Sequence, residues 1–103
     1  MEIINNIDKN RFEIHLLDKL SILDYSIKFK KMIFAHTEVP VELAGQGIAK
    51  ALVIDAIKFA EKNNYKIIPV CKYAERFFSK HQEYNHLLDG FKIWLVYFGI
   101  EEI

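Results

Sequence analysis

The chain changes from strand to helix within the stretch Val39-Pro40-Val41-Glu42-Leu43-Ala44-Gly45-Gln46-Gly47-Ile48-Ala49. A run of apolar and β-branched residues ends at the proline, which cannot donate a hydrogen bond to a β-ladder. Two glycines follow, and glycine permits both a tight turn and a close approach of the backbone to a ligand. Apolar residues then recur at helical spacing. The stretch therefore predicts a strand, a glycine loop and the start of a helix.

The predicted helix is amphipathic from Ile48 to Ala60, and Asn63-Asn64 is a suitable stop because Asn tolerates the left-handed conformation. The first amides of a helix lack intrahelical partners and carry the positive end of the helix dipole. A glycine loop at such a start is typical of a site for phosphate or pyrophosphate. On spacing alone, a connection that merely needs a tight turn stays an alternative, and the ligand stays unnamed.

The residues before the loop predict strands. Apolar and polar side chains alternate over Arg11–Leu16 and again over Leu23–Lys30, and a third apolar run covers Met32–Val39. Asp18-Lys19 suits a tight turn between the first two strands.

The residues after the long helix predict a short strand over Tyr65–Val70, a second helix over Glu75–Gln82 and a last β-like run over Gly90–Ile100. An antiparallel meander that feeds a crossover helix gives a mixed α/β sheet.

Composition excludes several classes of protein. A chain of 103 residues fits one domain, residues 1–103. Fourteen basic and fourteen acidic residues balance, so we expect no nucleic-acid partner. The single cysteine and four histidines have no zinc-ligand spacing, so we expect no metal. No apolar run approaches the roughly 20 residues of a membrane span, and no secretory signal is seen. By elimination, we expect a cytoplasmic protein.

Four motifs together resemble a known family. Gly45-Gln46-Gly47-Ile48-Ala49 resembles the coenzyme A signature of the GNAT N-acetyltransferase superfamily, Gln/Arg-x-x-Gly-x-Gly/Ala. With it, His36-Thr37-Glu38-Val39-Pro40, Ile68-Pro69-Val70-Cys71-x-Tyr73 and His81-x-Glu83-Tyr84 resemble a family of small GNAT-like proteins. The match spans residues 33–88. The chain departs from the signature at its first position, which is Ala44.

The resemblance implies an α/β (α+β) fold: a mixed, mostly antiparallel sheet, a long helix after the glycine loop and a second, shorter helix. It implies acetyl-CoA as cosubstrate and N-acetyl transfer to an amine acceptor that the sequence does not identify. The residues expected to bind coenzyme A are Val39, Gln46, Gly47, Ile48, Ala49, Lys50 and Tyr73. Lys50 would screen the pyrophosphate charge, and Tyr73 would line the channel unless it belongs to the core.

The catalytic candidates are Cys71, His36 and Glu38. Cys71 follows a strand and precedes a helix, where it could protonate the leaving thiolate or, less readily, carry the acyl group. His36 could act as a base or orient the amine, and the resemblance places carbonyl polarisation around Glu38. A buried structural cysteine and a hydrogen-bonded structural histidine are the alternatives.

A second function stays open: a non-catalytic module that binds acyl-CoA or another protein. Ala44 favours it because a side chain is missing from the signature. The run from Phe91 to Phe98 favours it too, since both of its faces are apolar. Such a strand must be covered within the sheet or by a second copy, which would give a homodimer through the C-terminal strand.

Overall fold

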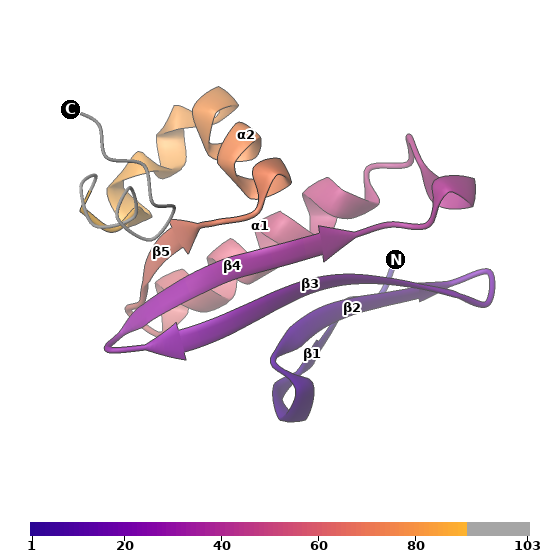
Figure 1. The fold of residues 1–103 in the computed structure, drawn as a ribbon, viewed down its shortest axis with the longest axis horizontal. Coiled ribbons are helices and arrows are strands. Elements are labelled where there is room, and N and C mark those ends of the chain that lie inside the picture. The colour runs from indigo at the N-terminus through magenta and orange to yellow at the C-terminus, as the bar shows by residue number, and fades with distance from the viewer. Residues whose placement is uncertain (91–103) are drawn as a thin grey trace.

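The computed structural model describes residues 1–90 and shows a five-stranded sheet with two α-helices in that part of the chain (Figure 1). In chain order the elements are β1 (Ile4–Asn6), η1 (Ile7–Lys9), β2 (Arg11–Leu16), β3 (Lys19–Lys28), β4 (Lys31–Glu38), η2 (Val41–Leu43), α1 (Ile48–Lys62), β5 (Lys66–Pro69), α2 (Lys72–Lys80) and η3 (Gln82–Leu87), where η is a 3₁₀ helix.

The sheet follows the chain in the order β1-β2-β3-β4-β5. The pairs from β1 to β4 are antiparallel, and β4 with β5 is parallel. Parallel neighbours need a crossover connection, and α1 supplies it. This arrangement confirms the predicted mixed, mostly antiparallel sheet with a long helix after the glycine loop and a shorter second helix.

Both hairpin turns consist of two residues with positive φ. Leu17 and Asp18 have φ of 53° and 60°, and Phe29 and Lys30 have φ of 52° and 65°. Turns of this kind match the right-handed twist of the flanking strands. The predicted Asp18-Lys19 turn is therefore wrong by one residue, and the predicted strand over Leu23–Lys30 starts earlier and ends before Phe29. Sequence patterning failed here because two bulky apolar residues occupy turn positions, with Leu17 73% and Phe29 90% exposed.

The long helix α1 lies across one face of the sheet, behind the strands in Figure 1. Its buried side chains pack against the inner face of β2 to β5, and those of α2 join the same core. The buried residues of α1 are Ile48, Leu52, Val53, Ala56, Ile57 and Ala60. The predicted helix and its stop are confirmed, since Asn63 caps α1 and Asn64 has a φ of 60°.

The second helix begins three residues earlier than predicted. It covers Lys72–Lys80 instead of Glu75–Gln82, because the Sγ of Cys71 accepts a hydrogen bond from the Ala74 amide at 3.4 Å and so acts as its N-cap. Ser, Thr, Asp and Asn are the usual capping residues, so a cysteine gave no start signal. The predicted strand over Gly90–Ile100 lies outside the described residues apart from Gly90.

The strand β2, next to the edge strand β1, holds a buried carboxylate that the sequence did not predict. Glu13 is 5% exposed and accepts hydrogen bonds from Arg11 at 2.7 Å and Asn6 at 3.0 Å, and it lies 3.0 Å from His15 Nε2. The hydrogen bond from Arg11, followed by the one from His15, lowers the pKa of Glu13 from its usual 4.5 to about 2. His15, for which the sequence offered no partner, thus belongs to a network that ties β1 to β2.

Candidate active site

The two glycines before α1 adopt conformations that other residues avoid. Gly45 has a φ of 81°, and Gly47, the N-cap of α1, has a φ of 77°. A Cβ built at either position meets no atom within 4 Å. The glycines are therefore needed for the backbone conformation and not for close packing. The space above the loop is open to a ligand.

The start of α1 has the free backbone donors and the lack of negative charge that suit an anion. No side chain caps it within residues 1–90, and no acidic residue lies in its first turn. The first amides of a helix have no intrahelical acceptors, so those of α1 at Ile48, Ala49 and Lys50 point out of the helix start. The helix has 15 residues, long enough for a macrodipole whose positive end lies here. Phosphate oxygens are the acceptors that suit this geometry.

A pocket of about 300 Å³ opens at this helix start. Three segments contribute to it: the residue after β4, the loop from η2 into α1, and the first turn of α2. Its lining residues are Val39, Leu43, Ala44, Gly45, Gly47, Ile48, Ala49, Lys50 and Tyr73. The structure thus brings together every residue predicted to bind coenzyme A except Gln46, which is exposed on the loop and does not line the pocket. Burial raises the pKa of Tyr73, so its hydroxyl stays a neutral donor.

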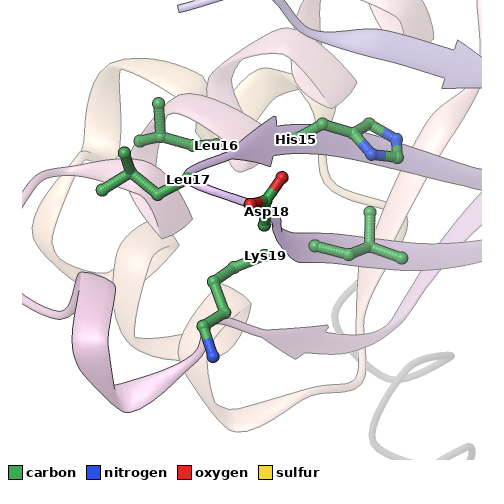
Figure 2. Close-up of a pocket in the computed structure, with 6 residues that line it drawn as sticks. His15, Leu16, Leu17, Asp18 and Lys19 are labelled. Carbon is green, nitrogen blue, oxygen red and sulfur yellow. The ribbon is translucent and has the colours of Figure 1, made fainter.

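A larger hollow of about 460 Å³ lies at the tip of the β2–β3 hairpin (Figure 2). All the residues that line it, from His15 to Leu20, belong to that single hairpin. It contains neither a glycine loop nor a helix start, so size alone does not make it the better site. The hairpin reaches the glycine loop at one exposed ion pair, where Lys19 Nζ lies 3.5 Å from Glu42 Oε2 in η2.

The parallel strands β4 and β5 separate beside the pocket. Their pairing ends at Phe34 and Pro69, and the Phe34 carbonyl accepts hydrogen bonds from the amides of Val70 and Cys71, each at 3.0 Å. At the next residue, Ala35, the register of β4 against β3 shifts by one. Such a β-bulge bends a strand and strengthens its twist. Beyond it, within the described residues, β4 pairs with β3 alone, which leaves a wedge between β4 and the start of α2.

Cys71 lies at this wedge and is half-buried. Its Sγ accepts the Ala74 amide hydrogen bond and lies 3.3 Å from the Oγ1 of Thr37 on β4. The thiol is therefore held between an amide of the α2 start and a hydroxyl of β4. Thr37 belongs to one of the sequence motifs, but no role was predicted for it because a threonine in a strand carries no signal of its own.

His36 and Glu38 form a pair on the other face of β4. Their side chains are exposed, and His36 Nε2 lies 3.2 Å from Glu38 Oε1. Neighbouring residues of a strand point to opposite faces, so the two side chains that flank Thr37 point away from the face on which Thr37 meets Cys71. The structure thus brings His36 and Glu38 together and separates this pair from Cys71.

Leu43, Ala44 and Gly45 also line the pocket. They belong to the stretch in which the sequence placed the coenzyme A site, but no individual binding role was predicted for them. Gly45 gave a signal through its place in the loop. Leu43 and Ala44 contribute through the η2 turn, a short 3₁₀ segment that the sequence pattern did not distinguish from loop. Within residues 1–90, no cluster of three or more His, Cys, Asp or Glu could hold a metal ion. No helix in the same residues has the length and apolar character needed to cross a membrane.

These features define a mixed α/β domain with a glycine loop and an uncapped helix start at its crossover helix. A model of the GCN5-related N-acetyltransferase family matches residues 11–87. The chain therefore belongs to this family, whose general activity is acetyl transfer, and the resemblance inferred from the sequence motifs is confirmed.

A solved structure supports the same assignment. It is the solution NMR structure of a GCN5-like candidate N-acetyltransferase from Staphylococcus aureus, which shares 30% sequence identity with this chain and superposes with a TM-score of 0.71. The alignment covers 86% of this chain and 88% of that protein. A search of curated proteins finds no significant match.

Proposed function

We propose that the chain transfers the acetyl group of acetyl-CoA to the nitrogen of an amine. The observation that carries this proposal is the pocket at the start of α1, lined by an uncapped helix start and adjoining the wedge between β4 and β5. The fit is chemical: the helix start offers amide donors to a pyrophosphate, and the wedge offers an unpaired strand edge to a pantetheine chain.

The start of α1 and the free edge of β4 would bind different parts of acetyl-CoA. Gly47, Ile48 and Ala49 would donate backbone amides to the pyrophosphate, with the Lys50 ammonium as a nearby positive charge. Gln46 lies outside the pocket lining and would contribute only through its backbone. The free strand edge beyond Ala35 would donate an amide to the thioester carbonyl, where negative charge develops during attack by the amine.

Residues on opposite faces of β4 would carry out the two proton transfers of the reaction. The amine must lose a proton and the departing thiolate must gain one. The exposed His36–Glu38 pair suits the first task, since the carboxylate can hold the imidazole in one orientation. Cys71, held at the wedge, suits the second. The open setting of His36 and Glu38 favours an acceptor that the protein does not enclose, such as a polyamine or a lysine side chain.

The test is acetyl transfer with both products measured. Purified protein is incubated with acetyl-CoA and with spermidine, a lysine-containing peptide or a small primary amine. The acetylated amine is quantified by mass spectrometry, and the free thiol of coenzyme A by a colorimetric reaction. The proposal expects equal amounts of the two products with at least one acceptor. Thiol release that is the same with and without amine would contradict it.

The alternative function is a non-catalytic acyl-CoA-binding module, which the absence of a side chain at Ala44 favours. It expects saturable binding of acetyl-CoA with no acetylated amine from any acceptor. A homodimer through the C-terminal strand remains a proposal about residues outside those described. Sedimentation over a range of protein concentrations tests it, and a strict monomer would rule it out.

A further inference from the structure

A side-chain contact joins β4 to Cys71, the residue that caps α2. Val39, the residue after β4, and Tyr73 on α2 both line the pocket. Thr37 and Cys71 precede these two residues by two positions each, and the Oγ1 of Thr37 lies 3.3 Å from the Sγ of Cys71. The contact therefore joins the two segments that also supply Val39 and Tyr73 to the pocket.

The sulfur of Cys71 has two hydrogen-bond partners among the described residues. The Ala74 amide donates to Sγ from the α2 side, and the Thr37 hydroxyl can donate to it from the β4 side. With both donors in place, the Sγ proton of Cys71 is free to point into the wedge. Thr37 Oγ1 has no other hydrogen-bond partner among side chains of residues 1–90, so this contact is where its hydroxyl is satisfied.

We propose that Thr37 positions the thiol of Cys71 so that its proton points toward the leaving sulfur of the thioester. This inference rests on the proposed function and adds a positioning residue to it. Thr37 acts through Cys71 and does not itself touch the reacting atoms.

Protons and bonds balance in this step. The neutral amine nitrogen attacks the carbonyl carbon and forms the C–N bond, and the C–S bond of the thioester breaks. The leaving sulfur takes the proton of Cys71 Sγ, and the nitrogen loses one proton to His36 or to water. Cys71 then regains a proton from water. One amide and one free thiol result, and Cys71 is restored.

The test compares two substitutions of Thr37. Thr37→Val keeps the shape and removes the hydroxyl, whereas Thr37→Ser keeps the hydroxyl. At saturating amine we expect Thr37→Val to lower kcat about five- to tenfold, as loss of one hydrogen bond at the reacting site implies, with KM for acetyl-CoA changed less than about twofold. Thr37→Ser should keep kcat within about twofold of the parent protein. In a Cys71→Ala background, Thr37→Val should cause no further loss, because its route of action is gone.

A second measurement does not require turnover. Cys71 is the only cysteine of the chain, so the mass increase on reaction with iodoacetamide reports this thiol alone. At a fixed neutral pH we expect Thr37→Val to slow alkylation about fivefold and Thr37→Ser to leave it nearly unchanged. Equal alkylation rates in all three proteins, or equal kcat losses with and without Cys71, would overturn the inference. A parent protein without turnover, but with the expected alkylation rates, would refute the proposed function and leave the positioning of Cys71 in place.

Discussion

Substitution of Gly47 separates three contributions to ligand binding at the start of α1. The position lines the pocket and has a φ of 77°, and a Cβ added there would meet no atom within 4 Å. A side chain here enters open space instead of clashing with the protein. Any residue other than glycine costs about 1–2 kcal/mol of stability through its left-handed backbone. Gly47→Ala measures that cost alone, and Gly47→Gln adds the bulk of a long side chain.

Gly47→Glu differs from Gly47→Gln by one negative charge. Unit charges about 5 Å apart at an effective dielectric constant of about 20 repel by about 3 kcal/mol. The loop is exposed, so solvent and salt reduce this value by up to about half. We therefore expect the Kd for acetyl-CoA to be about 10- to 100-fold weaker in Gly47→Glu than in Gly47→Gln.

Calorimetric titration with acetyl-CoA at low salt gives these dissociation constants, and a repeat at high salt should narrow the gap between Gln and Glu. Circular dichroism checks that all three variants remain folded. Equal affinity of the Gln and Glu variants would refute the placement of an anion at this helix start. Loss of binding in Gly47→Ala, with its fold intact, would refute the view that the space above the loop is open.

Three further predictions concern stability. Leu52 is fully buried in α1, so Leu52→Ala should lower the free energy of unfolding by about 2–5 kcal/mol, as measured by urea titration. Lys58 lies on the exposed side of the same helix, and Lys58→Ala should change this free energy by less than about 0.5 kcal/mol. Similar losses in the two variants would contradict the packing of α1. Because the pKa of Glu13 is lowered from 4.5 to about 2, its ionised form stabilises the fold above pH 4.5 and this contribution, at most about 3 kcal/mol, is lost as the pH falls toward 2. Glu13→Gln should flatten the dependence of unfolding free energy on pH in that range, and an unchanged dependence would count against the network. Phe29→Asn should stabilise the fold by about 1 kcal/mol and so raise the midpoint of thermal unfolding, since Asn tolerates the left-handed turn. The control is Phe29→Ala, in which the residue still adopts an unfavourable conformation. An equal gain in stability in both variants would refute this reason.

The part of the site that could be predicted from the sequence is the part made by backbone. Gly45 and Gly47 carry a signal because few other residues adopt a positive φ, and the helical spacing from Ile48 fixes where α1 starts. Proline at position 40 marks the end of the strand. Each of these signals depends on local geometry, so a single sequence is enough to find it.

The part that could not be predicted depends on which strands and helices become neighbours. The contact between Thr37 and Cys71 joins residues 34 positions apart, and neither residue marks it locally. The start of α2 was missed for a different, local reason: the sulfur of Cys71 caps the helix where an oxygen is usual. The Ala35 bulge was also missed, since it becomes visible only as a register shift against β3.

The bulge explains why one stretch of β4 can serve two purposes. Up to Phe34, the strand is paired on both sides and its side chains build the core. Because Ala35 shifts the register and β5 ends at Pro69, the residues from His36 to Glu38 keep their ladder to β3 and lose a neighbour on the other side. The chain thus obtains a rigid strand with one unpaired edge, ending at the glycine loop. In a domain this small, this unpaired stretch of β4 contacts the thiol of Cys71 and leads, through the glycine loop, to the uncapped start of α1.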